Sequence, residues 1–181
     1  MPGFFVDKDD FMKAICFGDS NTWGYDPRGY FGGQYDCPWP ELLGELTGWE
    51  VVNNGSCGRE IPRRAVEFPA DADFLIVMLG TNDLLQGASA REAGERMGKF
   101  LDTLDREKVL LLVPPPMTPG EWTNPTVIEE SRKLMDAYRN LGVRTIDAGK
   151  WAIPMAYDGV HFTEEGHSIF AQRLKEELTH A

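Results

Sequence analysis

The sequence predicts a three-layer α/β/α domain built on a central parallel sheet of five strands. Predicted strands and helices alternate five times along the 181 residues. Two of the strands, Phe74–Leu79 and Val109–Val113, are continuous apolar runs. Such runs are typical of strands buried on both faces, as in a parallel sheet covered by helices.

Polar residues, Gly or Pro mark ends of three of the predicted strands. The first ends at Gly18, the third lies between Asp73 and Gly80, and the fourth is closed by Pro114. In chain order, the predicted strands are Lys13–Phe17, Glu50–Asn53, Phe74–Leu79, Val109–Val113 and Val143–Asp147.

The helices are predicted from apolar spacing and from residues typical of helix ends. Gly48 and Gly142 end the first and fourth helices, and Pro62 restricts the second to a first-turn start. Thr163 is expected to cap the last helix, which has acidic residues in its first turn. The predicted helices are Glu41–Thr47, Arg59–Glu67, Ala90–Leu104, Thr126–Leu141 and Glu164–Leu178. Two long loops, Trp23–Pro40 and 114–127, are rich in Gly and Pro.

Length and composition indicate one domain over residues 1–181, with a flexible N-terminal segment over residues 1–11. A net charge of −11 disfavours nucleic acid and anionic membranes as partners. No secretory signal is apparent, and the longest apolar runs are too short to span a bilayer. Three cysteines without a metal-binding spacing are expected to be free thiols, so we expect a cytoplasmic protein.

Four short polar segments carry the residues that indicate chemistry. They are Gly18-Asp19-Ser20-Asn21, Asn54-Gly55, Gly80-Thr81-Asn82-Asp83 and Asp158-Gly159-Val160-His161. Three come directly after predicted strands, and the fourth lies in the loop after the fifth strand. Because the carboxyl ends of parallel strands meet at one edge of a sheet, we expect all four to form one site.

These segments contain the groups needed to hydrolyse an ester. Ser20 is the predicted nucleophile and His161 its base, while Asp158 can accept the Nδ1–H of His161 across the turn at Gly159. The predicted oxyanion donors are the N–H groups of Ser20 and Gly55 and the side-chain amide of Asn82. Taken singly, each residue also has an ordinary interpretation, such as a helix-capping serine, a packed histidine or a turn glycine.

Assembled in this order, the four segments resemble those of the SGNH, or GDSL-type, hydrolase superfamily. The segment Phe17–Pro27, with Trp39-Pro40 and Gly58-Arg59, is similar to the small arylesterase-like branch. The resemblance implies a flavodoxin-like fold, the triad of Ser20, Asp158 and His161, and oxyanion donors at Ser20, Gly55 and Asn82. It also implies that no metal or organic cofactor is used. One departure is Asn21, where many relatives have leucine, and we expect it to alter local packing or the pocket wall. The turn is not Gly-x-Ser-x-Gly, because Thr22 replaces the second glycine, and this argues against an α/β-hydrolase.

Specificity is expected to lie in the aromatic loops. The residues predicted to contact substrate are Asn21, Trp23, Tyr25, Trp122, Ile153 and Val160. We expect a small-molecule ester with a short acyl chain, because no long apolar segment suggests a lipid tunnel. The same aromatic surface could instead form a subunit interface, so a homo-oligomer is a second expectation.

Several other functions remain open at this stage. A carbohydrate O-deacetylase or an acyltransferase could use the same triad, since access of water decides what attacks the acyl-enzyme. A non-catalytic binding module could retain the fold. A metal-dependent phosphoesterase is disfavoured, because few His and carboxylate residues are clustered in the sequence.

Overall fold

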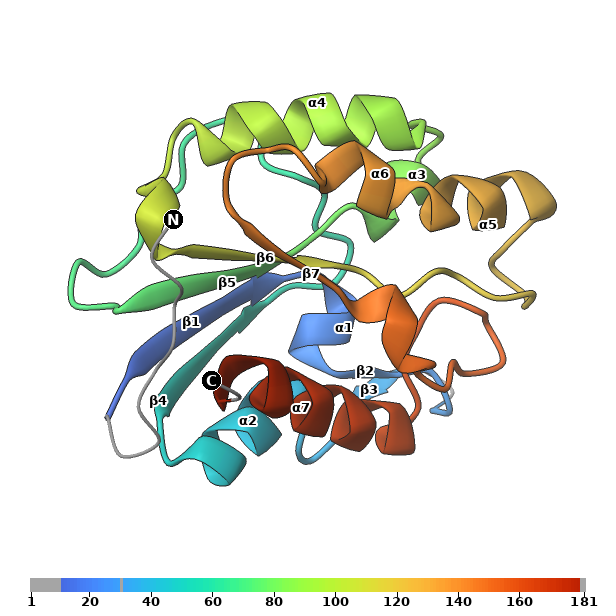
Figure 1. Ribbon diagram of the computed structural model, residues 1–181. Helices are drawn as coiled ribbons and strands as arrows, with labels where there is room; N and C mark the ends of the chain where they lie inside the picture. The colour runs from blue at the N-terminus through green and yellow to red at the C-terminus, as the bar shows by residue number, and fades with distance from the viewer. Residues whose placement is uncertain (1–10, 30, 180–181) are drawn as a thin grey trace.

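Five parallel strands form the central sheet in the computed structural model, which describes residues 11–29 and 31–179 (Figure 1). The predicted three-layer α/β/α fold is confirmed. The strands are β1 (Lys13–Gly18), β4 (Glu50–Gly55), β5 (Phe74–Met78), β6 (Val109–Val113) and β7 (Arg144–Asp147). Residues 1–10 of the segment expected to be flexible lie outside the described residues.

Helices cover both faces of this sheet. Helices α2 (Trp39–Thr47) and α7 (Glu164–Thr179) pack on one face (Figure 1). The other face is covered by α3 (Thr81–Leu85), α4 (Ala90–Leu101), α5 (Pro125–Arg132) and α6 (Leu134–Tyr138). Short 3-10 turns at Arg106–Lys108 and Ala148–Trp151 flank β6 and β7.

Successive residues of each strand point to opposite faces of the sheet, and this divides the apolar runs between two cores. Ile15 and Phe17 of β1 pack in the cluster that contains Phe100 of α4. Ala14 and Cys16 pack in the cluster that contains Trp39 of α2. The apolar residues of β1, β5 and β6 are buried for this reason, as the sequence predicts.

The strand order places the carboxyl ends of β1 and β5 at a switch in topology. The sheet runs β4-β1-β5-β6-β7, so the chain passes from β1 to one neighbour and then crosses back to the other. Gly18 pairs with Gly55 on one side and with Met78 on the other. Crevices that bind ligands in open α/β sheets form at such switch points, and here Ser20 and Asn82 follow the two strands involved.

Two helix predictions are wrong, and both failures have a local cause. Residues 59–70 form no helix; the N–H of Ile61 donates to the carboxylate of Asp83 and Pro62 follows it. The helix expected over Thr126–Leu141 is divided at Lys133 into α5 and α6, and it begins at Pro125 inside the segment expected to be a loop. Asn124 caps α5 by accepting the N–H of Val127.

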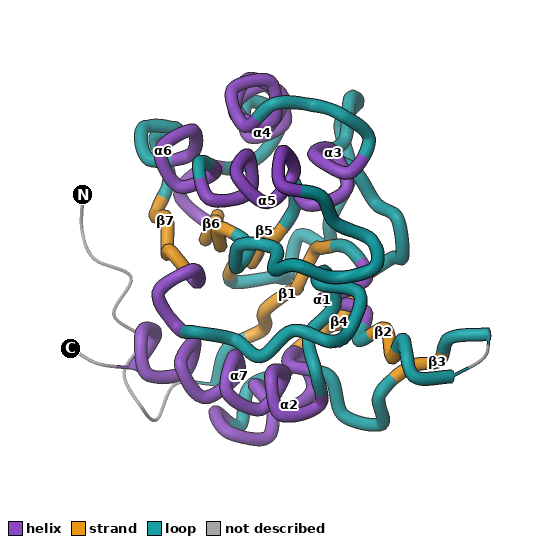
Figure 2. Tube along the Cα trace, turned by 90° about the vertical axis from the view of Figure 1, so that its right-hand side faces the viewer, coloured by secondary structure: helices purple, strands orange, loops and turns teal. Residues whose placement is uncertain are grey.

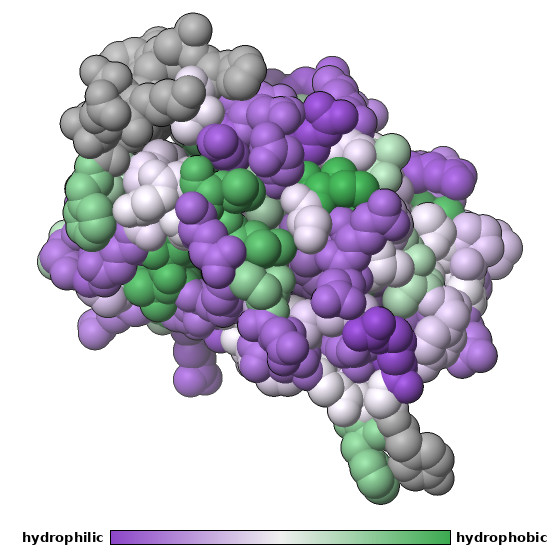
Figure 3. Space-filling model, turned by 90° about the horizontal axis from the view of Figure 1, so that it is seen from below, coloured by the Kyte–Doolittle hydropathy of each residue, from purple (hydrophilic) through white to green (hydrophobic). Residues whose placement is uncertain are grey.

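The segment predicted as a loop over Trp23–Pro40 contains regular structure. Strands β2 (Tyr25–Asp26) and β3 (Gly33–Gln34) form a short antiparallel hairpin that projects from the body (Figure 2). Helix α2 begins at Trp39 rather than Glu41. On the face that carries α2 and α7, hydrophilic side chains predominate and apolar ones lie between them (Figure 3). No helix within the described residues is both long and apolar enough to cross a membrane.

Candidate active site

Ser20 is the first residue of the four-residue helix α1 (Ser20–Trp23), directly beyond β1. Asp19 caps this helix with its side chain, which accepts the N–H of Asn21 at 2.9 Å. The N–H groups of Thr22 and Trp23 donate to the carbonyl of Asp19. Among the described residues no acceptor is found for the N–H of Ser20, so this donor is available beside the serine hydroxyl.

The structure brings the three predicted triad residues together. The Oγ of Ser20 lies 2.9 Å from Nε2 of His161, although 141 residues separate them in the chain. Nδ1 of His161 lies 2.6 Å from Oδ2 of Asp158. All three side chains are buried. A proton on Nδ1 satisfies Asp158 and leaves Nε2 to accept the Ser20 hydroxyl, which is the arrangement required of a general base.

Asp158 is held by the same turn that carries the histidine. Its Oδ1 accepts the N–H groups of Val160 and His161 at 2.9 and 3.0 Å, while its Oδ2 faces the imidazole. Gly159 makes this turn possible, because its φ is +79° and a Cβ there would lie 2.2 Å from the carbonyl oxygen of Thr118.

Two carboxylates near the site have shifted pKa values of opposite sign. Burial raises the pKa of Asp158, but hydrogen bonds from the His161 ring and from the N–H groups of His161 and Val160 outweigh burial and lower it overall. Burial raises the pKa of Asp19 to about 6, opposed by the hydrogen bond from the N–H of Asn21 and by the positive charge of Arg59. Asp158 therefore stays ionised at neutral pH, as an orienting carboxylate must.

Aromatic rings lie against the imidazole of His161. The ring of Tyr25 is centred 4.5 Å from it, and Trp122 meets it edge to face at 5.3 Å. Trp122 is 51% exposed and the N–H of its backbone donates to the carbonyl of Asp158. The hydroxyl of Tyr157 donates to the carbonyl of Pro27, which joins this loop to the β2–β3 hairpin. The rings of Tyr25 and Trp122 therefore flank the imidazole of His161, and we call them the aromatic walls of the site.

The other residues predicted to contact substrate are Asn21, Trp23, Ile153 and Val160. Ile153 and Val160 are only 7% and 3% exposed and belong to the two hydrophobic cores, so they offer almost no side-chain surface to a substrate. The backbone of Trp23 packs against Gly55. The side chain of Asn21 is buried and hydrogen-bonds to the chain on either side of His161. Packing or hydrogen bonds therefore occupy the side chains of Asn21, Ile153 and Val160, and a substrate contact of Trp23 stays a prediction.

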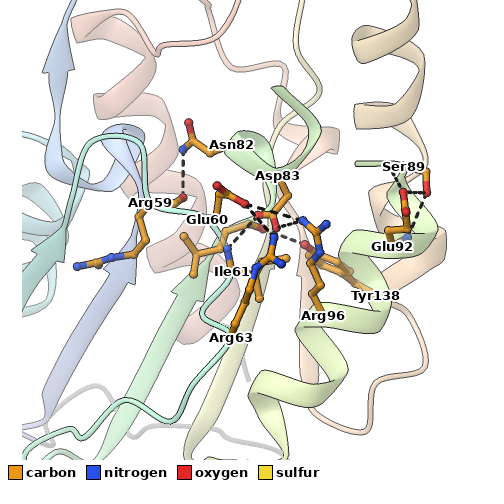
Figure 4. Close-up of polar contacts among 11 residues, drawn as sticks. Arg59, Glu60, Ile61, Arg63, Asn82, Asp83, Ser89, Glu92, Arg96 and Tyr138 are labelled. Atoms are coloured by element: carbon orange, nitrogen blue, oxygen red, sulfur yellow. Dashed lines mark hydrogen bonds and ion pairs between the residues drawn. The ribbon is translucent and has the colours of Figure 1, made fainter. Parts of the chain in front are cut away.

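Asn82 lies at the start of α3 and faces the loop that follows β4 (Figure 4). Its Nδ2 donates to the carbonyl of Arg59 at 3.1 Å, which orients the amide and leaves its second N–H for another acceptor. The next residue, Asp83, is fully buried. Its carboxylate accepts the N–H of Ile61 and one N–H of Arg96, each at 2.9 Å (Figure 4). Asn82 and Asp83 together fix residues 59–61 against α3.

The structure does not support Gly55 as an oxyanion donor. Its N–H donates to Oδ1 of Asn53 at 2.9 Å. The N–H of the next residue, Ser56, bonds to Gly18 of β1, so that of Gly55 points away from β1, because alternate residues of a strand direct their N–H groups to opposite sides. Three residues later, Gly58 has a φ of +75° and open space where a Cβ would be. Within the described part of the chain, nothing accepts the N–H of Gly58.

Arg59 joins the ends of β1 and β4, a role that the sequence does not indicate. Its guanidinium donates to the carbonyl of Gly18 at 3.0 Å and to the carbonyl and side chain of Asn54. It also lies over the ring of Phe17, 4.2 Å from the centroid. Gly58-Arg59 and Asp83 were visible as motif residues, but their partners are distant in the sequence. Only the folded structure shows which residues contact Arg59 and Asp83.

All three cysteines of the chain lie within the described residues. Cys16, Cys37 and Cys57 are free thiols. Within residues 11–29 and 31–179, no group of three or more His, Cys, Asp or Glu side chains could hold a metal ion.

Residues 16–169 match the GDSL-like lipase/acylhydrolase family, which is more than half of the chain. The chain belongs to this family. It is accordingly a carboxylic ester hydrolase of the SGNH/GDSL type. A comparison with curated proteins gives no significant match.

Solved structures of this family share the fold over nearly their whole length. A putative arylesterase from Agrobacterium tumefaciens is 28% identical, with a TM-score of 0.75 over 92% of this chain and 98% of that one. An aryl esterase from M. smegmatis is 24% identical, with a TM-score of 0.77 over 92% and 97%. A carbohydrate acetylesterase from Sinorhizobium meliloti is 22% identical, with a TM-score of 0.74 over 92% and 97%.

Proposed function

We propose that this GDSL-like hydrolase cleaves short-chain, acetyl-type esters of aryl or other small alcohols through an acyl-enzyme at Ser20. The observation that carries the proposal is the continuous hydrogen-bonded chain from Ser20 through His161 to Asp158. In the proposed mechanism His161 takes the Ser20 proton as the hydroxyl attacks the acyl carbon. It then protonates the departing alcohol, and water releases the acid by the same route.

The oxyanion is proposed to rest on three donors, with Gly58 in place of Gly55. The N–H of Ser20 and the second N–H of the Asn82 amide are two of them. The N–H of Gly58 is the third, because it has no described acceptor and its neighbour Arg59 is bound by Asn82. Donors held in place before the reaction stabilise the developing charge without reorganisation.

The aromatic walls favour a flat or sugar-like alcohol portion. His161 must reach the leaving oxygen, so the alcohol portion lies beside the imidazole. Tyr25 and Trp122 flank that imidazole and can stack on an aryl group or a sugar ring. A short acyl group is supported by the burial of Ile153 and Val160, whose side chains are occupied by the cores instead of extending an acyl pocket. The names of the relatives, arylesterase and carbohydrate acetylesterase, agree with this proposal.

The test is a series of nitrophenyl esters of increasing acyl length, run on the wild type and on Ser20→Ala. We expect the highest kcat/KM with acetate, and a loss of at least about 10³-fold in the variant. Fluorophosphonate should label the wild type at Ser20 and leave the variant unlabelled. A maximum at long acyl chains would overturn the short-chain proposal, and full activity of Ser20→Ala would overturn the nucleophile.

A carbohydrate O-deacetylase is the second candidate, supported by the exposed ring of Trp122 beside His161. Comparing acetylated sugars with aryl acetates distinguishes the two. A Trp122→Ala substitution that impairs only the sugar substrates would favour the deacetylase.

A further inference from the structure

Asn21 connects the helix of the nucleophile to the loop of the base. Its side chain is 4% exposed and reaches from α1 to residues 160–162, about 140 positions later in the sequence. Nδ2 donates to the carbonyl of Val160 at 3.0 Å, and Oδ1 accepts the N–H of Phe162 at 2.9 Å. Both ends of one carboxamide are therefore bound to the backbone of the base loop.

These two backbone groups belong to the peptide units on either side of His161. The carbonyl of Val160 is part of the peptide that precedes the His161 Cα, and the N–H of Phe162 is part of the peptide that follows it. Holding both peptides restricts φ and ψ of His161 and therefore the direction in which its side chain leaves the backbone. The clamp starts from the residue next to Ser20, so it relates the position of the base directly to that of the nucleophile.

The side-chain contacts of His161 with Asp158, Tyr25 and Trp122 do not set this relation. Asp158 lies on the same turn as His161 and would move together with it. Tyr25 and Trp122 contact the ring through their faces and edges, which restrains its sideways motion but fixes no hydrogen-bonding direction. The 2.9 Å contact of Ser20 with Nε2 is the geometry to be maintained, and it changes during the reaction.

We propose that Asn21 is a positioning residue that holds His161 in register with Ser20, in place of the substrate contact predicted from the sequence. This inference rests on the proposed triad. A misplacement of about 1 Å in a catalytic group can cost about 100-fold in rate. The part of the reaction that needs alignment is the proton transfer, so the clamp should act on kcat and leave substrate binding largely unchanged.

The first test replaces Asn21 by leucine, which has a similar size and no hydrogen-bonding group. We expect kcat for an aryl acetate to fall about 10- to 100-fold, with KM within about threefold of the wild type. Thr22→Val is the matched control, because Thr22 is the next buried residue of α1 and its hydroxyl has no partner among the described residues. The control should keep wild-type kcat. Thermal unfolding of all three proteins shows whether the fold is retained.

The second test uses Asn21→Asp, which keeps the shape and the acceptor for the Phe162 N–H but lacks the donor to Val160. When protonated, the introduced carboxyl group can again donate to that carbonyl. The ratio of variant to wild-type kcat should therefore rise as the pH falls. The ionisable side chains nearby, Asp19, Asp158 and His161, are the same in both proteins, so taking the ratio at each pH separates their effect. A purely structural role would change the unfolding temperature and leave this ratio constant.

The outcomes separate the clamp from the function on which it rests. A kcat for a folded Asn21→Leu variant within about twofold of the wild type would overturn the clamp, and so would a pH-independent ratio for Asn21→Asp. If the leucine variant does not fold, the ratio for the aspartate variant decides. Inactive Ser20→Ala together with unaffected Asn21 variants would refute the clamp alone, whereas full activity of Ser20→Ala would refute the triad.

Discussion

The two halves of the site are built in different ways. The base half consists of Asp158, Gly159 and His161 in one turn, and its main hydrogen bonds join residues two or three positions apart. The proposed oxyanion half takes donors from three separate segments. Its supporting contacts, from Asn82 to Arg59 and from Ile61 to Asp83, join residues 23 and 22 positions apart. Local bonds shape the turn that carries the base, while contacts between distant segments support the proposed oxyanion donors.

This difference predicts which substitutions damage function alone and which also damage the fold. A local turn can lose one polar group and keep its backbone, since Gly159 and the flanking loops still shape it. The oxyanion half shares its contacts with the core, because Asp83 is fully buried and Arg59 lies on Phe17. The predictions below proceed from the largest expected effect to the smallest.

The largest effect is expected for Asp158→Asn, which breaks the base half without changing its size. The amide cannot accept the Nδ1–H while keeping the correct orientation, so kcat should fall by about 10⁴-fold. The free energy of unfolding should change little. Steady-state kinetics measure the loss, and Asp136→Asn, at an exposed carboxylate paired with Arg139, is the control. A loss of less than about tenfold would mean that Asp158 does not orient the base.

Asn82→Ala should remove one donor from the oxyanion half and lower kcat about 10²- to 10³-fold. Its companion is Asn53→Ala, which frees the N–H of Gly55. If Gly58 is the donor, as proposed, this second variant should stay within about threefold of wild-type kcat. A change in kcat well beyond that range would indicate that Gly55, and not Gly58, is the oxyanion donor. Both measurements use the same aryl acetate.

Asp83→Asn tests whether the oxyanion half depends on the core. The variant retains an acceptor for the Ile61 N–H but loses the charge that pairs with Arg96. We expect a loss of about 1–3 kcal/mol in unfolding free energy and about tenfold in kcat. Chemical denaturation measures the first quantity. Glu95→Gln, at an exposed ion pair with Arg91, is the matched control and should change neither. Unchanged stability would show that the buried pair does not support this half.

Acid should lower the free energy of unfolding through His167, a buried histidine. Burial lowers the pKa of His167 to about 3, while its unfolded value is 6.5. The unfolded chain binds the extra proton between these values, so this contribution to stability is present above pH 6.5 and is lost as the pH falls toward 3. The slope is at most about 1.4 kcal/mol per pH unit. Unfolding measured from pH 7 to 4 should show a shallower slope for His167→Asn, whose side chain can still accept the N–H of Trp39. Equal slopes for the wild type and the variant would show that His167 does not cause the loss of stability in acid.

Much of the architecture could be predicted from local pattern. Continuous apolar runs indicate β5 and β6, and the parallel arrangement of the sheet follows from the alternation of strands with helices. The two wrong helices show where pattern is insufficient. At residues 59–67 the N–H of Ile61 is bound by a carboxylate 22 residues away, and no local preference reveals such a partner. The break at Lys133 follows two residues after Ser131, whose hydroxyl donates to the carbonyl of Ile128 and accepts the N–H of Met117.

The sequence by itself determined the α/β/α fold, the family and the three residues of the triad, Ser20, His161 and Asp158. It could do so because strand ends share one edge of a parallel sheet and the Asp–His turn is local. Only the tertiary structure decided that the N–H of Gly55 donates to Asn53 and that Arg59 and Asp83 support the oxyanion half. It also decided that Asn21 binds the backbone on either side of His161. Each of these depends on the direction of a hydrogen bond between distant segments, which the order of residues does not specify.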